Sequence, residues 1–276
     1  MERETLRKAV RDRYGRIAMD TKNSCCNSAS PCCSSSTLTQ LSKNIGYSEA
    51  ELKEIPEGAN LGLGCGNPVA LASLREGETV LDLGAGAGFD CFLAANRVGK
   101  SGRVIGVDMT PEMVALAREN ASKNDFTNVE FRLGEIEYLP VADNSIDVII
   151  SNCVINLSLD KARVFGEAFR VLRPKGRLMI SDIVLLKPLP DIIKSSIEAY
   201  VGCVAGALIK EEYLAIMETA GFSDIKIINE TPFPIDFVAN DPTVATIIKQ
   251  SEVSIEDIVD AATSVLSVKI HGIKIH

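Results

Sequence analysis

The sequence predicts an α/β fold in which a mostly parallel, doubly wound sheet carries helices on both faces. From Thr79 onward, short β-branched runs alternate with helical segments, which is the rhythm of βαβ units that build a parallel sheet. The runs are apolar at both alternating sets of positions, as expected for strands covered on both faces. A chain of 276 residues with 46% hydrophobic residues can bury one large core, alone or with a modest appended module.

The first element is predicted to be a helix over residues 1 to about 20, largely covered by Arg and Lys. Its apolar face consists of Leu6, Val10, Tyr14 and Ile17. The next segment, residues 21–37, is rich in Ser and Asn and has almost no large apolar side chains, so burial cannot order it. We expect a mobile loop there. It carries four cysteines: Cys25, Cys26, Cys32 and Cys33.

Five strands are expected in the core, with helices in the gaps between them. They are TVLDLG (79–84), RVIGVDM (103–109), VEFRLG (129–134), IDVIIS (146–151) and GRLMISDIV (176–184). The helix after the second strand has Thr110 as its N-cap, Pro111 at its first position and Glu112 near the positive end of its dipole. Residues 191–220 form another helical region. Strand character returns in SDIKIIN (223–229) and SVLSVKIHGIKIH (264–276).

The charge and hydropathy of the chain indicate which classes of partner and which cellular compartment to expect. With 29 basic and 37 acidic residues, the formal charge of −8 gives no broad positive field for nucleic acid or an anionic membrane surface. No apolar run approaches the roughly 18 residues of a membrane span, and the charged N-terminus does not resemble a signal peptide. We therefore expect a cytoplasmic protein. There, the eight cysteines are expected to be metal-binding, catalytic or redox-active rather than a static disulfide framework.

The most specific motif is VLDLGAGAG (80–88), where a strand runs into a tight glycine turn and then into a helix. The glycines accept positive φ and let a cofactor lie against the backbone of Gly84, Ala85, Gly86 and Gly88. A dinucleotide fingerprint needs glycine where Phe89 stands, so nicotinamide binding is disfavoured. Asp82 would repel a pyrophosphate but would attract the cationic amino group of S-adenosylmethionine.

Further elements follow the glycine turn in the order and spacing of Rossmann-like class I methyltransferases, whose motif I the turn resembles. Asp108 ends the second strand, where its carboxylate can accept hydrogen bonds from both ribose hydroxyls, and Met109 could pack on the adenine. The resemblance implies that Glu135 and the Ile136 backbone meet the adenine edge and that Asn152 lies near the methionine half of the cofactor. It also implies that the last strand of the sheet is antiparallel.

Three cysteines lie in segments that surround the expected cofactor site. Cys65 is in the glycine-rich turn LGLGCGNP (61–68), Cys153 follows the fourth strand, and Cys203 lies in the helical insertion. A single cysteine is ordinarily a small buried hydrophobe, and Cys91 is interpreted in that way. Three together form a soft thiolate cage, and trivalent arsenic prefers three sulfur ligands.

The segments LGLGCGNP, VLDLGAGAGFD, SNCVINL and AYVGCVAGAL, with Tyr14-Gly15 and the CC pair that follows, resemble those of arsenite methyltransferases over nearly the whole chain. The resemblance implies that Cys65, Cys153 and Cys203 form the arsenic site and that Cys25 or Cys26 cooperates with Cys65. The expected organisation is an N-terminal helix and cysteine-rich loop (1–60), a Rossmann-like core (61–230) with a helical insertion at about 190–220, and a C-terminal substrate-side subdomain (231–276) with the final strand.

The expected reaction is transfer of methyl groups from S-adenosylmethionine to arsenite and methylated arsenicals, with arsenic detoxification as its role. Arsenic(III) has a lone pair and needs no base, which suits a chain whose two histidines, His271 and His276, are expected to be exposed tail residues. Cys65 and Cys25 or Cys26 could return arsenic to the trivalent state by forming a disulfide, which glutathione or thioredoxin would reduce.

Three other interpretations remain open at the sequence level. The chain could methylate a small organic acceptor such as a quinone or a sterol precursor, with the cysteines as core residues. It could be a metalloid sensor or sequestering protein that kept the fold without the chemistry. The four N-terminal cysteines could also bind zinc, although adjacent cysteines rarely aim both sulfurs at one ion.

Overall fold

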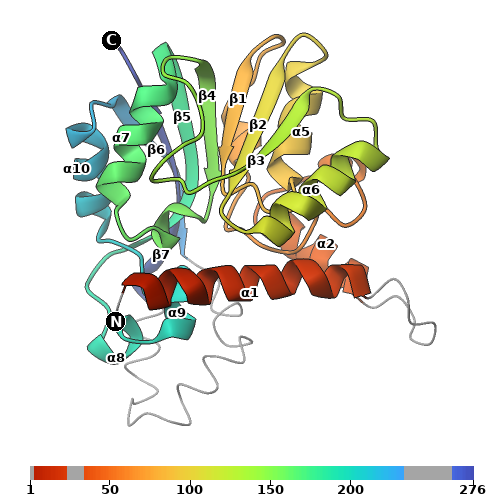
Figure 1. Cartoon of the computed structure of the whole chain (residues 1–276). Helices are drawn as coiled ribbons and strands as arrows, with labels where there is room; N and C mark the ends of the chain where they lie inside the picture. Colours follow the sequence, from red (N-terminus) through yellow and green to blue (C-terminus); the bar gives the residue numbers. More distant parts are fainter. Residues whose placement is uncertain (1–2, 24–33, 233–262) are drawn as a thin grey trace.

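The computed structural model describes residues 3–23, 34–232 and 263–276, and within them one seven-stranded sheet runs through the molecule (Figure 1). The strand order is β3-β2-β1-β4-β5-β7-β6. The strands are β1 (Thr79–Leu83), β2 (Arg103–Asp108), β3 (Val129–Leu133), β4 (Ile146–Asn152), β5 (Leu172–Leu185), β6 (Ser223–Pro232) and β7 (Val265–Ile273). β1 to β5 are parallel, and β7 is antiparallel to β5 and β6. The predicted mostly parallel sheet with an antiparallel last strand is confirmed.

Helices cover both faces of the sheet. They are α1 (Arg3–Asn23), α2 (Ser34–Asn44), α3 (Glu49–Glu54), α4 (Pro68–Leu71), α5 (Phe89–Val98), α6 (Pro111–Lys123), α7 (Lys161–Val171), α8 (Asp191–Lys194), α9 (Ile197–Val201), α10 (Lys210–Thr219) and the short 3₁₀ helix η2 (Ile155–Leu157). α4, α5 and α6 pack on one face, and α7 and α10 pack on the other. In β1, Val80 faces the first group and Leu81 the second, and both are fully buried. This burial explains why the strands are apolar at both alternating positions.

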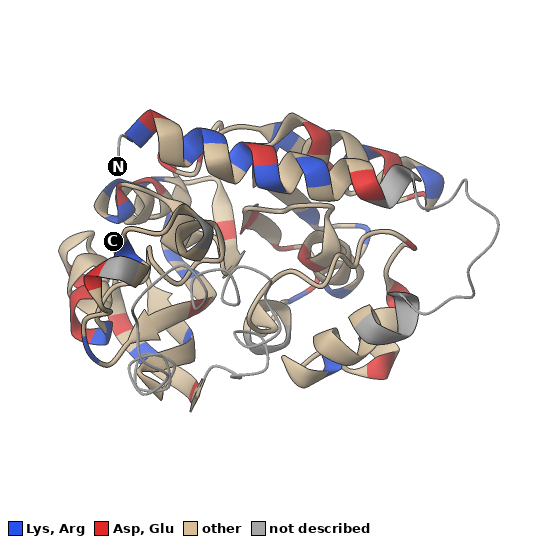
Figure 2. Ribbon diagram, turned by 90° about the horizontal axis from the view of Figure 1, so that it is seen from below, with Lys and Arg blue, Asp and Glu red and all other residues tan. Residues whose placement is uncertain are grey.

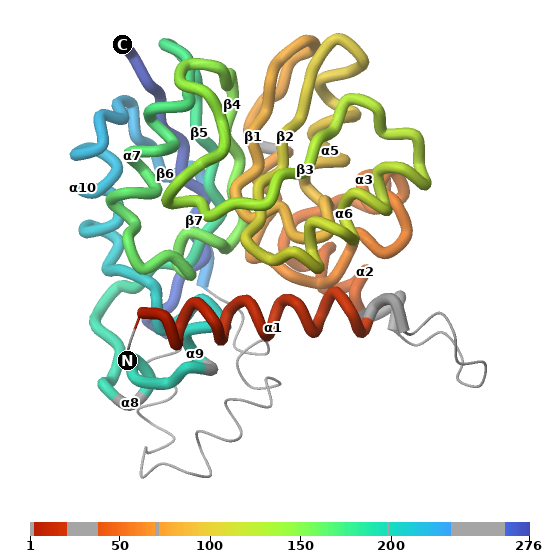
Figure 3. Tube along the Cα trace, viewed as in Figure 1, coloured from red at the N-terminus to blue at the C-terminus, as the bar shows by residue number. Residues whose placement is uncertain are grey.

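The N-terminal helix α1 lies across the carboxyl ends of the strands (Figure 1). Leu6 and Val10 pack against Tyr200 and Val201 of α9, and Ala18 packs near the start of α6. α1 therefore connects α9 at one end to α6 at the other, as the trace in Figure 3 shows. Basic and acidic residues alternate along its outer surface (Figure 2). The predicted helix with one apolar face is confirmed.

One segment is more helical than the sequence predicts. The loop expected over residues 21–37 is helical at both ends, because α1 continues to Asn23 and α2 begins at Ser34. Once a helix such as α2 exists, each further turn adds hydrogen bonds at little cost, and local composition does not show this. Cys25, Cys26, Cys32 and Cys33 lie outside the described residues.

The helical region predicted at residues 191–220 consists of three helices, α8, α9 and α10. Cys203 lies in the turn between α9 and α10, with a φ of 67°. Its amide donates to the Tyr200 carbonyl, which closes that turn.

The last strand completes the core sheet, since β7 lies between β5 and β6. His271 belongs to this strand, where it is opposite Met179 and Lys226, so its expected place in an exposed tail is wrong. His276 is exposed. The remaining part of the predicted C-terminal subdomain, residues 233–262, lies outside the described residues, and that assignment stays a prediction. Among the helices described, none combines the length and the apolar character that a membrane crossing requires.

Candidate functional site

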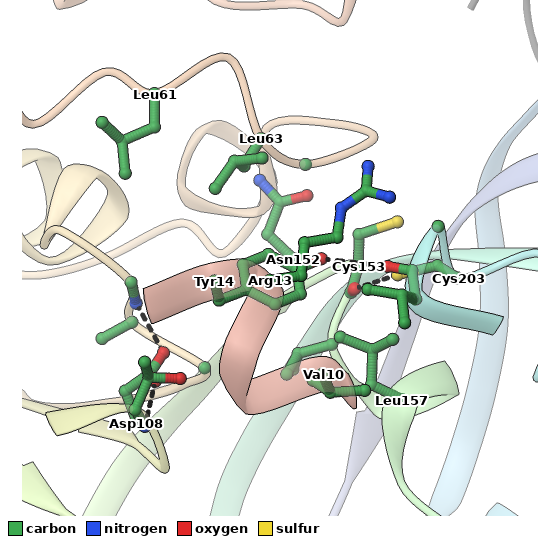
Figure 4. A pocket seen from close by; sticks show the side chains of 18 of the residues that line it. Val10, Arg13, Tyr14, Leu61, Leu63, Asp108, Asn152, Cys153, Leu157 and Cys203 are labelled. Carbon is green, nitrogen blue, oxygen red and sulfur yellow. Dashed lines mark hydrogen bonds between the residues drawn. The ribbon is translucent and has the colours of Figure 1, made fainter. Parts of the chain in front are cut away.

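A cavity of about 360 Å³ opens at the carboxyl ends of β1, β2 and β4, beneath α1. One end of it is lined by the glycine turn and Asp108, and the other by Cys153 and Cys203 (Figure 4). Tyr14 of α1 extends into the space between these ends (Figure 4). The predicted cofactor residues other than Gly88, together with two of the predicted cysteines, therefore line the same cavity. Gly88 packs against Phe92 and Phe131 instead.

The glycine turn after β1 presents bare backbone both to the loop after β4 and to the cavity. Gly84, at φ 73°, would overlap Val154 if it had a Cβ atom. Gly86, at φ 52°, has no atom within 4 Å of the corresponding position, and it lines the cavity. A Cβ atom there would occupy the space in which a ligand could lie against the backbone. The turn is therefore a cradle for a flat or extended small molecule.

Asp108 is oriented by two backbone donors at the end of β2. The Gly86 amide donates to its Oδ2 atom at 2.9 Å, and the Thr110 amide donates to its Oδ1 atom at 2.8 Å. Burial raises the pKa of the carboxyl group, and these hydrogen bonds oppose that shift. The Thr110 side chain also hydrogen-bonds this carboxyl group, and Asp108 lines the cavity. A carboxylate has about four acceptor positions, so it can still accept hydrogen bonds from a ligand. Thr110 begins α6 as predicted, although its side chain does not cap the helix.

Met109, Glu135 and Ile136 line the same end of the cavity. The Glu135 carboxylate also faces α1, with Arg7 Nη2 at 3.7 Å and Arg11 Nη2 at 4.0 Å. These half-exposed ion pairs contribute little to stability. Their effect is to connect α1 to the loop after β3, so that the helix covers the cavity.

Asp82 is buried on β1 and lines the cavity near the glycine turn. The thiol of Cys91 donates to its Oδ2 atom at 3.2 Å. Burial raises the pKa of Asp82 well above its usual value, and the nearby Asp90 carboxylate raises it further. Cys91 is fully buried, in agreement with its interpretation as a core residue, but it also has a polar partner.

Two residues of the cavity wall, Tyr47 and Asp90, were not identified from the sequence. The Tyr47 hydroxyl donates to Asp90 Oδ1 at 2.7 Å, and the Asn152 amide donates to Asp90 Oδ2 at 3.0 Å. Burial raises the pKa of Asp90 to about 6, while these two donors lower it. Asp90 stands directly after the glycine turn, so an acidic residue in the first turn of α5 was the one available signal. Tyr47 comes before the sheet and has no local signal.

The Asp90 carboxyl predicts a pH-dependent stability. The folded protein holds this proton up to about pH 6, whereas an unfolded aspartate loses it near pH 4. The stabilisation is therefore fully present at low pH and is lost as the pH rises through that window. We expect Asp90→Asn to remove this pH dependence. Between about pH 4 and pH 6, the free energy of unfolding of the variant should rise relative to that of wild type by on the order of 2 kcal/mol. Urea unfolding at both ends of the window measures it, and parallel pH curves for the two proteins would contradict the assignment.

Asn152, at the end of β4, holds the glycine-rich turn that carries Cys65 against the sheet through side-chain hydrogen bonds. Its Oδ1 atom accepts from the Cys65 amide at 2.9 Å, and its Nδ2 atom donates to the Gly66 carbonyl at 2.8 Å and to the Tyr47 hydroxyl at 2.9 Å. A carboxamide can do this because it is both a donor and an acceptor. The Ser267 hydroxyl of β7 donates to the Cys65 carbonyl at 2.8 Å. The turn is thus held by β4 and β7.

The close packing of this turn predicts that Gly66→Ala displaces Cys65. A Cβ atom on Gly66 would overlap Ser181 Oγ, so the turn must move away from β5. We expect the arsenite binding that the sequence resemblance predicts for Cys65 to weaken by at least about tenfold, measured by titration of the reduced protein. Gly166→Ala is the matched control, because that exposed helical glycine has open space around it. It should leave affinity unchanged and raise the free energy of unfolding by about 0.5–1 kcal/mol. Equal affinities in both variants would contradict the account.

The three predicted cysteines of the described chain come together at one end of the cavity. Sγ of Cys65, Sγ of Cys153 and a carboxylate oxygen of Asp182 all lie within 4.8 Å of one another. The Cys203 thiol donates to the Cys153 carbonyl at 2.9 Å. Cys153 and Cys203 both have positive φ angles, 58° and 67°, which non-glycine residues rarely adopt. The backbone therefore bends in an unusual way at two of the three sulfurs.

The environment of Cys65 and Cys153 favours the protonated form of their thiols. Hydrogen bonds with Cys203 and Cys65 raise the pKa of Cys153 well above its usual value, and burial adds to this effect. Burial also raises the pKa of Cys65. The Tyr14 hydroxyl donates to the Val201 carbonyl at 3.4 Å, and burial together with Cys203 and Cys153 raises its pKa. Tyr14 lies between the sulfur end of the cavity and Asp108 (Figure 4).

Comparison with known proteins gives a consistent result. A family model described as a methyltransferase domain matches residues 74–221. An arsenite methyltransferase of Halobacterium salinarum is 52% identical over 231 residues, which cover 81% of this chain and 59% of that protein. An arsenite methyltransferase of Aquipseudomonas alcaligenes is 37% identical over 238 residues, covering 83% and 66%. This chain thus spans less than two thirds of the length of these curated relatives.

A solved structure is similar over most of both chains. The arsenic(III) S-adenosylmethionine methyltransferase from Chlamydomonas reinhardtii superposes with a TM-score of 0.62 and 32% sequence identity, covering 84% of this chain and 72% of that chain.

Proposed function

Because the chain belongs to the arsenite methyltransferase family, we propose that it transfers methyl groups from S-adenosylmethionine to trivalent arsenic held by Cys65, Cys153 and Cys203. The observation that carries the proposal is the shared cavity. A glycine cradle with an oriented aspartate lines one end, and Cys153 and Cys203 line the other. A soft metalloid bound to the sulfurs would therefore lie next to a cofactor bound in the cradle.

The residues at the cofactor end fit S-adenosylmethionine, which supplies an electrophilic methyl group on a sulfonium centre when it is bound. The Asp108 carboxylate would accept the ribose hydroxyls with the lone pairs that Gly86 and Thr110 leave free. Asp82 and Asp90 line this part of the cavity, where their carboxyl oxygens could accept hydrogen bonds from the cationic amino group of the cofactor. The adenine contacts of Met109, Glu135 and Ile136 belong to the same proposal.

Protonated thiols suit the loading of arsenite. Each S–H group of Cys65, Cys153 and Cys203 exchanges with one As–OH group, forms an As–S bond and releases one water molecule. No base has to carry protons away, since each thiol proton leaves with a hydroxide. The raised pKa values of Cys65 and Cys153 therefore do not oppose the reaction.

Methyl transfer needs alignment rather than acid–base catalysis. Arsenic bound by three sulfurs keeps a lone pair, which can displace the methyl group from the sulfonium, and no proton has to be removed. Neither His271 nor His276 lines the described cavity. The chain contributes by holding the two reactants in one enclosed space, an effect worth up to about 7–11 kcal/mol of the barrier. Four residues of α1 line that space: Arg7, Val10, Arg13 and Tyr14.

The redox step is proposed from the family resemblance. Methylation formally oxidises arsenic by two electrons, and two thiols that form a disulfide can return them. We assign this role to Cys65 with Cys25 or Cys26, and an external thiol such as glutathione or thioredoxin would reduce the disulfide. The cytoplasmic location that such reductants imply stays a prediction.

Transfer of labelled methyl groups from S-adenosylmethionine tests the proposed function. Arsenite and a thiol reductant are each added or omitted, and methylated arsenicals are separated and counted. We expect sustained transfer only when both are present. Cofactor binding without arsenite-dependent transfer would overturn the proposal and favour an organic acceptor such as a quinone or sterol precursor. Tight arsenite binding without cofactor binding would favour a non-catalytic metalloid-binding protein.

A further inference from the structure

A buried carboxylate lies next to the cysteine site and has no part in the proposed reaction. Asp182 is in β5, fully buried, and one of its oxygens is within 4.8 Å of both Cys65 Sγ and Cys153 Sγ. Cys203 does not belong to this tighter group. Within the described residues, the sulfurs therefore form two overlapping sets: three thiols, and two thiols with a carboxylate.

Asp182 is held rigidly in this position. Its Oδ1 atom accepts from the Asn156 side chain at 2.9 Å and from the Ile183 amide at 2.9 Å, and its Oδ2 atom accepts from the Tyr213 hydroxyl at 3.0 Å. Metal-ligating carboxylates in proteins are themselves hydrogen-bonded in this way, because such partners fix the ligand's orientation. A positive charge, the Lys161 ammonium, acts on Asp182 from nearby.

We propose that Cys65, Cys153 and Asp182 form a second, overlapping site for a borderline divalent cation such as Zn²⁺, which competes with trivalent arsenic for the two shared thiols. The competition with arsenic rests on the proposed function, because that proposal assigns the arsenic ligands. The cation ligands are inferred from the geometry alone. Zinc is bound in proteins by cysteine sulfur and by aspartate oxygen together. Trivalent arsenic, a softer centre, takes the third sulfur of Cys203 instead.

The charges of this second site can be balanced, and its ligands leave room for the four-coordinate geometry of zinc. Binding of Zn²⁺ releases the two thiol protons to solvent and leaves two thiolates and one carboxylate around the cation. The remaining negative charge is offset by Lys161. Three protein ligands leave a fourth tetrahedral position, which water can fill from the cavity side, where Cys153 is half-buried.

Zinc titration of the reduced full-length chain tests the inference. Cys25, Cys26, Cys32 and Cys33 are changed to serine in every protein, so that N-terminal thiols do not contribute. Competition with a chromophoric chelator measures Zn²⁺ affinity, and arsenite is titrated separately. Asp182→Asn should weaken Zn²⁺ by at least about tenfold and leave arsenite affinity unchanged. Cys203→Ser should weaken arsenite binding and leave Zn²⁺ affinity unchanged. The exposed Asp191→Asn is the matched control and should change neither.

Cobalt(II) spectra give a measurement that does not depend on the folding of the Asp182 variant. The intensity of the sulfur-to-cobalt charge-transfer band follows the number of thiolates on the ion. We expect it to persist in Cys203→Ser and to fall to about half in Cys65→Ser, as expected for a two-thiolate site. Addition of one equivalent of arsenite should abolish the band in the parent protein.

Three outcomes would overturn the inference. They are unchanged Zn²⁺ affinity in a folded Asp182→Asn protein, a cobalt band that loses intensity in Cys203→Ser, and a band that survives in a protein to which arsenite has been shown to bind. Failure of arsenite to bind the parent protein would instead overturn the proposed function, because zinc binding does not require it.

Discussion

Replacement of Cys153 or Cys203 with serine is expected to lower arsenite-dependent methyl transfer by more than about a hundredfold. Cys153 lies between the other two sulfurs, since it interacts with both Cys65 and Cys203. A hydroxyl is a hard donor that does not replace a thiol on arsenic, so either variant loses one of three As–S bonds. Initial rates with labelled S-adenosylmethionine measure the effect.

Cofactor binding should survive in these two variants, because the cradle and Asp108 lie at the other end of the cavity. Calorimetric titration with S-adenosylmethionine provides this check. Cys91→Ser is the matched control: the serine hydroxyl can still donate to Asp82, and the residue is outside the sulfur group. It should retain transfer close to wild type. Normal turnover in Cys153→Ser or Cys203→Ser would rule out the three-sulfur site.

The second large effect is expected for Asp108→Ala, which should weaken S-adenosylmethionine binding by about 10- to 100-fold. A hydrogen bond to a charged group is worth about 1.5–3 kcal/mol, and the alanine also leaves the Gly86 and Thr110 amides without their acceptor. Calorimetry measures the affinity directly. Arsenite binding should be unaffected, since the sulfurs are at the far end of the cavity.

Asp12→Ala, a change of an exposed aspartate on α1, is the control for loss of a negative charge. It should bind the cofactor as wild type does. Unchanged affinity in Asp108→Ala would mean that the ribose lies elsewhere, and loss of arsenite binding in that variant would indicate misfolding rather than a lost contact.

The parts of the fold that the sequence predicted are those with a local pattern. Apart from Asp82, the buried positions of β1 and β2 carry no polar side chain, because both faces of the sheet are covered. This nearly continuous apolar run indicates that the strands are central in the sheet. The glycine turn and Asp108 were predicted for a similar reason, since a strand, a turn and a second strand end determine their geometry within a short stretch of chain.

The parts that the sequence did not predict depend on contacts between distant segments. The Tyr47–Asn152 contact joins residues 105 positions apart, and the Asp182–Tyr213 contact joins residues 31 positions apart. A carboxylate inside a strand, such as Asp182, gives no local sign that two cysteines from other segments will surround it. Asn152 was expected near the cofactor, but its hydrogen bond to the Cys65 amide is seen only in the folded chain.

Arsenic K-edge X-ray absorption tests most directly whether three sulfurs bind the arsenic. The reduced chain, with Cys25, Cys26, Cys32 and Cys33 changed to serine, is mixed with slightly less than one equivalent of arsenite. The account predicts a first shell of three sulfurs, and two sulfurs with one oxygen after Cys203→Ser. A three-sulfur shell that survives Cys203→Ser, or a parent protein in which oxygen dominates the shell, would contradict it.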